Sequence, residues 1–497
     1  MECGCRHGGI SLAKVARDLP DAELRGDTDV LDVTEDSRWV RRGALFCAVP
    51  GAHVDGHDFA DEAVAAGASA LLVRRFVDVP VPQVRVPAVR PAVGPVAAAV
   101  HGHPADALAV AAVTGTNGKT TTVHLIEAAL AAAGYRTGLV STVEARGPGV
   151  RNPAALTTPD AAELQRTLCR MRAAGVQAAA MEVSSHAVDQ HRIDPVTAEV
   201  AVFTNLSPEH LDYHGTTEQY YAAKAALFTP DACRRAVINI DDSWGRRLAA
   251  QARVPTVTVG RARLADVRVD AATATPGGMR VLVRDGCDEV ELTTPARGGQ
   301  AANLAAAYAA ARLMGVSRRD AAAGLGAAPP PGRYQRVDAG QPFQVVVDFA
   351  HTPPALAQLI ATARRANPAG RVHLVVGSAG NRDRFNRPDM GRVALAADTA
   401  IFTADDPYDE RPGEIIDQML TGTIGCGGAE VLVQEDRRRA IIAAVERAEP
   451  GDVVLIAGRG HERYQTVGGI RFPFNDVAVA EAALAGRVPR VSRHGAW

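Results

Sequence analysis

A glycine-rich turn constrains the fold of this chain more than any other segment. It reads Thr114-Gly115-Thr116-Asn117-Gly118-Lys119-Thr120-Thr121 and lies between an apolar run at 108–113 and a helical pattern at 121–133. Glycines let backbone N–H groups approach phosphates, a helix N-terminus attracts anions, and lysine adds a compact charge. This order predicts a strand, an ATP phosphate-binding loop and a helix, with the Thr120 hydroxyl available to Mg²⁺. Val113 stands where the strict pattern has glycine.

Lysine is scarce, and this sharpens the prediction. The chain has only Lys14, Lys119 and Lys224, and arginine supplies all other basic side chains among its 54 Lys and Arg residues. A chain that uses arginine almost everywhere is expected to keep lysine where a guanidinium cannot replace an amine. Lys119 and Lys224 are therefore candidates for chemistry.

Size and charge set broad limits. With 497 residues the chain is too long for one core and suggests about three domains. The formal net charge of −2 favours neither nucleic acid nor an anionic membrane as a partner. Seven scattered cysteines and the lack of a membrane-length apolar stretch are typical of a reduced, cytoplasmic protein without membrane insertion. We expect that location.

The pattern of elements predicts three α/β domains at 1–104, 105–330 and 331–497. In the first, short apolar strands accompany one helical pattern at 59–66, and the proline-rich stretch 79–95 with 101–104 is interpreted as strand edges and a linker. From residue 105, strands at 108–113, 137–141, 178–182 and 200–204 alternate with helices, which predicts a parallel sheet covered on both faces. The predicted helices lie at 121–133, 161–174, 303–313 and 319–325.

A second proline-rich linker at 329–332 precedes a further doubly wound, Rossmann-like unit. Its strands are predicted at 344–348, 372–376, 399–403 and 453–457. Asp348, Gly377, Asp405 and Gly458 stand at or just past the ends of these strands, so a ligand crevice is expected at the carboxyl edge of this sheet.

Three polar clusters follow the strands beside the glycine-rich turn. Glu182 ends an apolar run and His210 follows the next strand. Lys224 lies with Tyr220 in the segment 220–224, which is expected to begin a helix. Each has an ordinary structural explanation alone, such as a paired buried carboxylate or a solvated lysine. Because all three belong to one sheet edge, where a cation and nucleotide phosphates would lie, together they favour a functional site.

These segments, in this order, resemble the Mur ligase family over essentially the whole chain. The similarity is greatest to its members that add the third residue to UDP-N-acetylmuramoyl-L-Ala-D-Glu in peptidoglycan synthesis. The segments that carry the resemblance, apart from the turn at 114–121, are Asp36-Ser37-Arg38, 51–59, 156–159, 181–186, 190–192, Gly332-Arg333, 348–353, 405–407 and 458–462.

The resemblance implies an ATP-dependent amide ligase with two Mg²⁺ sites and an acyl-phosphate intermediate. Lys119, Lys224, His210 and Glu182 would be catalytic. Thr120, Glu182, His210 and Lys224, carbamylated by CO₂, would hold the metal. ATP would contact Gly115, Thr116, Asn117, Gly118, Lys119, Thr120, Thr121, Asn303, Arg333, Asp348 and His351. The UDP-linked dipeptide would contact Ser37, His53, Thr157, Thr158, Ser184, Gln190 and Arg192. The acceptor amino acid would contact Asp405, Asp406, Tyr408, Gly458 and Glu462.

The acceptor segments depart from the family pattern. Family members that add meso-diaminopimelate carry Asp-Asn-Pro-Arg, whereas this chain has Asp405-Asp406-Pro407-Tyr408 and so lacks the arginine that would pair with a distal carboxylate. The family's Gly-Lys-Gly-His-Glu is here Gly458-Arg459-Gly460-His461-Glu462. Arg411 is a possible substitute cation. We expect L-lysine, or another acceptor without a distal carboxylate, to be preferred over meso-diaminopimelate.

Other functions stay open from the sequence. They are a specialised paralogue that joins a different carboxylate and amine, a folylpolyglutamate synthetase-like ligase, a P-loop kinase, and a silent binding protein. The segment 36–38 argues against the folylpolyglutamate type, which generally lacks this domain, and the intact Lys119, Glu182, His210 and Lys224 argue against a silent protein. A monomer is expected.

Overall fold

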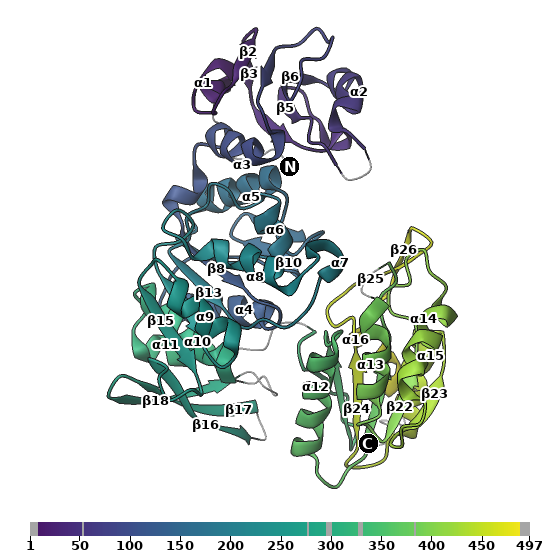
Figure 1. The fold of residues 1–497 in the computed structure, drawn as a ribbon. Helices are drawn as coiled ribbons and strands as arrows, with labels where there is room; N and C mark the ends of the chain where they lie inside the picture. The colour runs from purple at the N-terminus through teal and green to yellow at the C-terminus, as the bar shows by residue number, and fades with distance from the viewer. Residues whose placement is uncertain are drawn as a thin grey trace, which may run out of the picture.

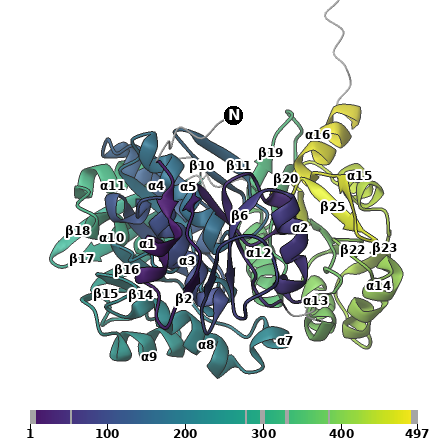
Figure 2. The same ribbon diagram turned by 90° about the horizontal axis from the view of Figure 1, so that it is seen from above.

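The computed structural model describes residues 8–51, 54–275, 278–294, 301–326, 332–381 and 384–487. Three α/β units, each with its own sheet, follow one another along the chain (Figure 1). From above, the N-terminal unit lies over the central one and the C-terminal unit stands to one side (Figure 2). The predicted three-domain α/β class is confirmed, while the boundaries at 104 and 330 stay predictions.

The N-terminal unit has a five-stranded sheet in the order β2-β7-β6-β5-β4. Its elements are β1 (Ile10–Ser11), α1 (Leu12–Arg17), β2 (Glu23–Arg25), β3 (Asp29–Val30), β4 (Asp32–Thr34), η1 (Ser37–Trp39), β5 (Ala44–Cys47), η2 (Gly56–Phe59), α2 (Ala60–Ala65), β6 (Ala68–Val73), β7 (Gln83–Arg85), α3 (Val89–Val100) and η3 (Pro104–Ala107). The helix predicted at 59–66 is α2.

The linker interpretation of the proline-rich stretch is wrong for much of its length, because α3 occupies Val89–Val100. Its buried residues Val89, Val93, Val96 and Val100 recur at helical spacing and pack in the N-terminal core. Pro91 lies in the first turn, where its missing N–H costs nothing, and tertiary packing outweighs the interior Pro95. The prolines therefore led to a linker being predicted where the valines form the buried face of a helix.

The central unit has an 11-stranded sheet in the order β11-β10-β9-β12-β8-β13-β14-β15-β16-β17-β18. Its strands are β8 (Ala109–Thr114), β9 (Thr137–Val140), β10 (Glu144–Gly147), β11 (Val150–Pro153), β12 (Ala178–Glu182), β13 (Val200–Phe203), β14 (Ala236–Asn239), β15 (Thr256–Gly260), β16 (Val267–Thr275), β17 (Gly278–Asp285) and β18 (Asp288–Thr294). Its helices are α4 (Lys119–Ala132), α5 (Ala161–Ala173), α6 (Ser185–Asp189), α7 (Leu211–His214), α8 (Thr217–Ala225), η4 (Ala226–Phe228), α9 (Ser243–Gln251), α10 (Ala301–Leu313) and α11 (Arg318–Leu325).

The predicted parallel pairing is confirmed for β9, β12, β8 and β13. The parallel arrangement continues through β14, β15 and β16, which were not predicted, and both edges of the sheet are antiparallel. The edge strands β10–β11 and β17–β18 were not predicted, because their alternating polar side chains lack the continuous apolar runs of buried strands. The apolar strand β8 lies between β12 and β13, where the strand order reverses, so the glycine-rich turn opens at the crevice expected of such sheets.

The C-terminal unit has a six-stranded sheet in the order β19-β20-β24-β21-β22-β23, with a separate hairpin of β25 and β26. Its strands are β19 (Gln335–Val337), β20 (Gln344–Asp348), β21 (Val372–Val376), β22 (Thr399–Phe402), β23 (Glu430–Val433), β24 (Val453–Ala457), β25 (Tyr464–Val467) and β26 (Ile470–Pro473). Its helices are α12 (Pro353–Ala366), η5 (Arg384–Asn386), α13 (Arg387–Ala394), α14 (Pro412–Leu420), η6 (Thr421–Thr423), α15 (Arg437–Arg447) and α16 (Asp476–Arg487). All four predicted strands are present.

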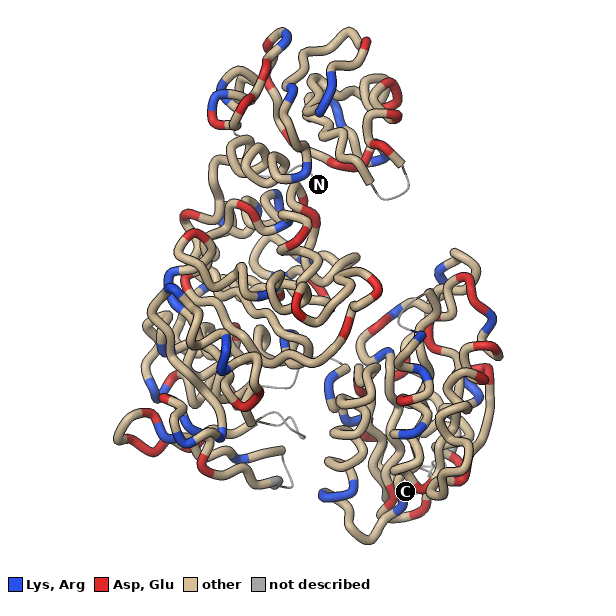
Figure 3. The backbone as a smooth tube through the Cα atoms, viewed as in Figure 1, with Lys and Arg blue, Asp and Glu red and all other residues tan. Residues whose placement is uncertain are grey.

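Charge is mixed over the whole molecule. Basic and acidic residues are interspersed in all three units (Figure 3), in keeping with the formal net charge of −2. Among the described residues, no helix is long and apolar enough to cross a membrane.

Candidate active site

The predicted phosphate-binding loop joins β8 to α4 in a conformation that needs glycine. Gly115 and Gly118 have φ of +143° and +90°. A Cβ on Gly115 would lie 2.0 Å from Thr204 Oγ1, and one on Gly118 would lie 2.5 Å from Asn303 Oδ1. Asn303 therefore lies against the loop, and its contact with ATP stays a prediction. No side chain caps the N-terminus of α4, which leaves its first N–H groups able to bind an anion.

The two candidate lysines converge on one carbonyl oxygen. Lys119 Nζ donates to the oxygens of Gly115 and Thr116, both at 2.8 Å. Lys224 Nζ, from α8, donates to the same Gly115 oxygen at 3.1 Å. Burial lowers the pKa of both amines, and the charge of Lys119 lowers that of Lys224 further, to well below its ordinary value. Lys224 is thus a buried amine that loses its proton readily.

Glu182 is fully buried and surrounded by hydroxyl and amide donors. Its carboxylate accepts hydrogen bonds from Thr120 Oγ1 at 3.1 Å, from Thr142 N at 2.8 Å and from Thr142 Oγ1 at 3.1 Å. Thr120 and Glu182, predicted from separate motifs, are therefore in contact. A buried carboxylate beside a hydroxyl is a donor set that suits Mg²⁺.

His210 and Lys224 reach this region from the segment after β13. The His210 ring lies 6.2 Å from the Tyr220 ring, and Lys224 Nζ lies 4.3 Å from the same ring. Burial lowers the pKa of His210, so its imidazole is neutral, the form that can bind a metal ion. Of the four predicted metal ligands, Thr120 and Glu182 are therefore in direct contact, while His210 and Lys224 both lie beside Tyr220.

The C-terminal unit completes the site from the other side. Arg333 Nη2 donates to Thr120 Oγ1 at 3.1 Å, and His461 Nε2 lies 3.3 Å from the oxygen of Thr142. Asp348 accepts from Tyr334 N at 2.6 Å and from Ala350 N at 2.8 Å, so it fixes the backbone next to Arg333. Burial raises the pKa of Asp348, which the nearby guanidinium opposes.

Glu209 is a candidate functional residue to which the sequence assigned no role. Its carboxylate lies 3.5 Å from Nε2 of His351, which belongs to the C-terminal unit, and 3.9 Å from Nε2 of His210. Burial opposes ionisation, but the hydrogen bond to His351 and the charges of His210, His351 and Lys119 lower the pKa of Glu209 to about 2. Its position, directly before His210 at the functional edge of the sheet, was the available signal.

The residues predicted to hold the UDP-linked substrate form a network that starts at Glu182. Thr158 Oγ1 donates to the Glu182 carbonyl at 3.0 Å and accepts from Ser184 N at 3.1 Å. Arg192 donates to Thr158 O at 3.1 Å and to Gln190 Oε1 at 2.6 Å. The Thr142 hydroxyl, which donates to Glu182, also lies 3.3 Å from Thr157 Oγ1, from which it can accept. The residues predicted to bind the substrate and those predicted to bind the metal are therefore connected by hydrogen bonds in the central unit.

The remaining two predicted substrate residues belong to the N-terminal unit. Ser37 lies in η1 and donates to Glu62 Oε1 at 3.3 Å, within its own unit. His53 lies outside the described residues.

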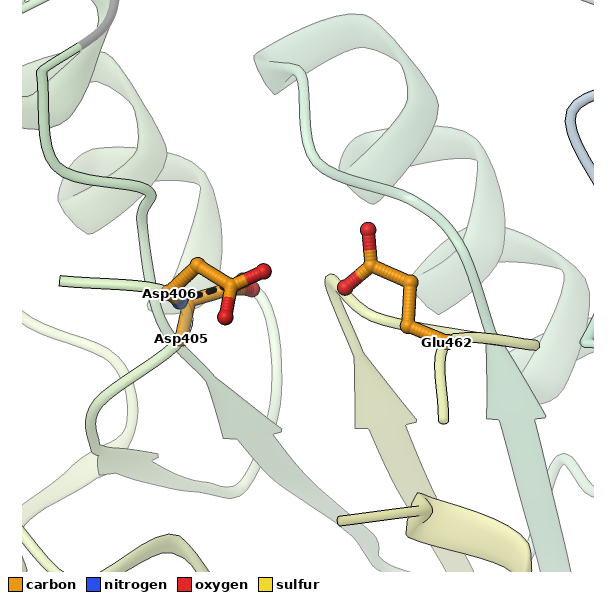
Figure 4. A group of neighbouring side chains, drawn as sticks. All are labelled: Asp405, Asp406 and Glu462. Atoms are coloured by element: carbon orange, nitrogen blue, oxygen red, sulfur yellow. Dashed lines mark hydrogen bonds between the residues drawn. The ribbon is translucent and has the colours of Figure 1, made fainter. Parts of the chain in front are cut away.

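The predicted acceptor residues gather at the carboxyl edge of the C-terminal sheet. One carboxylate oxygen each of Asp405, Asp406 and Glu462 lie within 4.8 Å of one another, with the two aspartates facing Glu462 (Figure 4). Gly458 has φ of +112°, and a Cβ there would lie 2.3 Å from Asp405 Oδ2. Burial, and next the charge of Asp405, raise the pKa of Glu462 to about 8. Three such carboxylates resemble a cation site, but the buried Arg459 guanidinium already lies among them.

Tyr408 and Arg411 differ in their relation to this pocket. Tyr408 has φ of +50°, and its backbone pairs with the β25 strand through Thr466 O. The Arg411 side chain is 86% exposed and lies 4.0 Å from Glu414. A residue so exposed is poorly placed to supply the missing cation.

Comparison with known proteins agrees with these motifs. The chain matches the Mur ligase family, catalytic domain over residues 32–112, the Mur ligase middle domain over 113–311 and the Mur ligase, glutamate ligase domain over 332–460. It is 42% identical over 494 residues to a protein of Streptomyces coelicolor named UDP-N-acetylmuramoyl-L-alanyl-D-glutamate–2,6-diaminopimelate ligase, covering 96% of this chain and 97% of that one.

Two further relatives extend the comparison. A UDP-N-acetylmuramyl-tripeptide synthetase of Deinococcus radiodurans is 40% identical, covering 94% of this chain and 97% of its own. A solved structure titled as a UDP-N-acetylmuramoyl-L-alanyl-D-glutamate–2,6-diaminopimelate ligase superposes with a TM-score of 0.67 at 32% identity, covering 96% of this chain and 99% of that one. The chain belongs to the Mur ligase family.

Proposed function

We propose that this protein is an ATP-dependent ligase that joins an amino acid to the D-Glu of UDP-N-acetylmuramoyl-L-Ala-D-Glu, a step of peptidoglycan precursor synthesis. The observation that carries the proposal is that Thr120 is hydrogen-bonded to a carboxylate of the central unit and to a guanidinium of the C-terminal unit. Its hydroxyl donates to Glu182 at 3.1 Å and accepts from Arg333, of another unit, at 3.1 Å. A triphosphate and a metal ion are the ligands that would separate such a carboxylate from such a guanidinium.

The residues present fit ATP and Mg²⁺. Backbone N–H groups of the turn, the start of α4 and Lys119 would hold the phosphates, and Asn303 would lie beside the adenosine portion. Thr120 and Glu182 would hold one Mg²⁺, and His210 with a carbamate on Lys224 would hold the second. The metal ions would supply neutralisation of the charge that develops on the phosphoryl group.

The carbamate on Lys224 is supported by the burial and surroundings of this amine. Two ammonium groups on the Gly115 oxygen repel each other, at 2.8 Å and 3.1 Å from the shared acceptor. An unprotonated amine can add to CO₂ with release of one proton, and the product is an anion. Lys119 would then face an opposite charge. The burial that lowers the pKa of Lys224 therefore favours this modification.

The remaining protein groups would orient the two substrates. Thr157, Thr158, Ser184, Gln190 and Arg192, with Ser37 and His53 of the N-terminal unit, would hold the UDP-linked dipeptide. Its D-Glu γ-carboxylate would attack the γ-phosphorus of ATP, forming an acyl phosphate and ADP. The unprotonated acceptor amine would then attack the carbonyl carbon, and the collapsing tetrahedral intermediate would expel inorganic phosphate.

The chain's own contribution to this chemistry is positioning and charge. Lys119 and Arg333 would offset the repulsion between a carboxylate and a triphosphate. Asp348 would steady the backbone that carries Arg333, and His351 with Glu209 would keep the C-terminal unit against the central one. Domain closure around ATP is expected, since the two sides of the site belong to different units.

The acceptor would bind at the C-terminal crevice by its α-ammonium group, through Asp405 and Glu462 beside Gly458. Tyr408 in place of an arginine favours an amino acid without a distal carboxylate, such as L-lysine. Several relatives are named as 2,6-diaminopimelate ligases, so diaminopimelate is the acceptor to compare with L-lysine. Cytoplasmic location and a monomeric state belong to the same proposal.

One assay tests the function. Purified protein is given UDP-N-acetylmuramoyl-L-Ala-D-Glu, ATP and Mg²⁺, with L-lysine, meso-diaminopimelate or no amino acid, and products are identified by mass spectrometry. We expect an amide product only when an amino acid is present, and none from Lys119→Ala. A stable phosphorylated product that forms without an amino acid would instead identify a kinase, and no product with any acceptor would refute the proposed substrate.

A further inference from the structure

The buried arginine of the acceptor pocket has one principal partner. The Arg459 side chain is fully buried, and its Nη1 lies 2.8 Å from Asp406 Oδ1. The other carboxylates are farther from the same nitrogen, with Glu462 at 3.4 Å and Asp405 at 3.6 Å. Its Nη2 donates to the oxygen of Tyr464, the first residue of β25. A guanidinium makes these two contacts through separate nitrogens, whereas the donors of an ammonium group all lie on one nitrogen.

The same aspartate connects the loop that follows β22, which contains Asp405, Asp406 and Tyr408 and is called the acceptor loop below, to the β25–β26 hairpin. Asp406 Oδ1 accepts from Thr466 N at 2.6 Å, in addition to its contact with Arg459. The backbone continues this attachment, because Tyr408 N donates to Thr466 O at 3.1 Å and Gly468 N donates to Tyr408 O at 2.6 Å. The loop after β22 and the hairpin therefore form one unit, joined by the side chain of Asp406 and by that of Gln465, which donates to Asp405 O.

The pairing decides which carboxylates remain for a substrate. A buried guanidinium without a partner is very unfavourable, so Arg459 must bind some carboxylate. If Asp406 were neutral, the nearest remaining carboxyl groups would be those of Glu462 and Asp405. Either would then be drawn into an internal ion pair and lost to an incoming ammonium group. Asp406 thus keeps the other two carboxylates available.

We propose that Asp406 and Arg459 are a positioning pair, whose mutual neutralisation holds the hairpin on the acceptor loop and leaves Asp405 and Glu462 to bind the acceptor. The proposal rests on the ligase function above. These are the two positions where the chain has aspartate for asparagine and arginine for lysine relative to the family pattern, and the two departures are in contact. The negative charge of Asp406 is therefore paired with Arg459 and does not bind the side chain of the acceptor.

A double-mutant cycle tests the pairing. We expect Asp406→Asn and Arg459→Lys each to raise KM for the acceptor about tenfold, with KM for ATP changed less than about twofold. The double variant should lose no more than either single one, a coupling of about tenfold, or ~1.4 kcal/mol. Asp409→Asn is the matched control, since this exposed carboxylate of the same loop binds Asn381 Nδ2 at 2.7 Å and should not alter KM. Effects that multiply in the double variant would overturn the pairing.

A second comparison separates positioning from direct contact with the acceptor. The fold-change caused by Asp406→Asn is measured with two acceptors that differ only at the distal end, L-lysine and L-norleucine. A positioning residue predicts the same fold-change for both. A loss confined to L-lysine would show that Asp406 binds the distal ammonium group and would overturn the proposal.

Hydrogen exchange provides a readout that does not need activity. Asp406→Asn should speed amide exchange in β25 and β26 at least about tenfold, because Thr466 N loses its charged acceptor, while exchange in β8 and α4 stays unchanged. Unchanged exchange in the hairpin would refute the structural part of the proposal. If the unmodified protein forms no amide with any amino acid, the proposed function fails, whereas this exchange result still judges the pair.

Discussion

The loop that ends β8 and the loops that end β22 and β24 occupy equivalent edges of two sheets, yet they are built differently. In the first, Lys119 and Lys224 bind a main-chain oxygen, and two glycines bring the backbone close to Thr204 and Asn303. In the second, side chains bind side chains, with Arg459 among three carboxylates. A site whose shape depends on the backbone conformation of glycines accepts few substitutions. In a site built from charged side chains, one ion pair can be replaced by another.

This difference explains where the two sites depart from the family pattern. The turn at 114–121 keeps the lysine, the threonines and the glycines that its conformation requires. The acceptor pocket has exchanged an asparagine, an arginine and a lysine of that pattern for Asp406, Tyr408 and Arg459. Two of these exchanges, Asp406 and Arg459, contact each other at 2.8 Å. Specificity is therefore expected to vary in the C-terminal unit while the phosphate chemistry stays fixed.

The largest effect is expected at Lys224. Lys224→Arg should lower kcat by about 100- to 1000-fold, because a guanidinium cannot carry a carbamate and one lost electrostatic group costs that much. Lys14→Arg makes the same change at an exposed residue of α1 and should leave kcat unaltered. Lys224→Ala should regain part of its activity with a short carboxylate such as acetate, measured by amide formation. A fully active Lys224→Arg would remove the main support for the carbamate.

A smaller effect is expected where the C-terminal unit reaches the nucleotide site. Arg333→Ala should raise KM for ATP and lower kcat, reducing kcat/KM about 10- to 100-fold, because the guanidinium at 3.1 Å from Thr120 completes the site. Arg336→Ala, an exposed arginine of β19, is the control. Unchanged ATP kinetics in a folded Arg333→Ala protein would mean that the units do not close on the nucleotide.

How much of this was predictable from sequence differs between the two sites. The strand, turn and helix around Gly115, Gly118 and Lys119 were predicted correctly, because their spacing is typical of a loop between a buried strand and a helix, whereas their contacts with a nucleotide stay predictions. Glu209 was missed because its importance depends on His351, which lies in another unit. The Asp406–Arg459 contact was missed for the same reason, since nothing local joins residues from different strand ends. Helix α3 was missed because local proline rules were outweighed by burial.

The acceptor preference should respond to one side chain by about tenfold. Tyr408→Arg should raise the ratio of kcat/KM for meso-diaminopimelate over L-lysine about tenfold, ~1.4 kcal/mol, by supplying a cation for the distal carboxylate. Tyr408→Phe is the control, as it adds no charge. If the unmodified protein already prefers meso-diaminopimelate tenfold, a cation other than residue 408 must bind its distal carboxylate, and Arg384 of η5, which lies 3.4 Å from Glu410, is the first to replace.

The smallest effect concerns stability and the pKa of Glu462, which is raised to about 8 by burial and by Asp405. Between about pH 4.5 and pH 8 the folded protein holds a proton that the unfolded chain has released, so stability falls as pH rises through this window. Glu462→Gln lacks this loss. We compare the unfolding temperature Tm of Glu462→Gln with that of the unmodified protein at each pH. The difference, variant minus unmodified, should be ~2–4 °C larger at pH 8.5 than at pH 5, which corresponds to about 1 kcal/mol.

The matched control for this measurement is Glu446→Gln, an exposed carboxylate of α15, which should show no pH-dependent difference. The sign of this difference shows whether Glu462 is protonated or ionised in the free protein. A Glu462 that is ionised and paired with Arg459 in the free protein would make Glu462→Gln less stable at pH 8.5 than at pH 5. The opposite sign is expected here, because Asp406 lies nearer to Arg459, at 2.8 Å, than Glu462 does, at 3.4 Å, and burial outweighs the charge of Arg459 at Glu462.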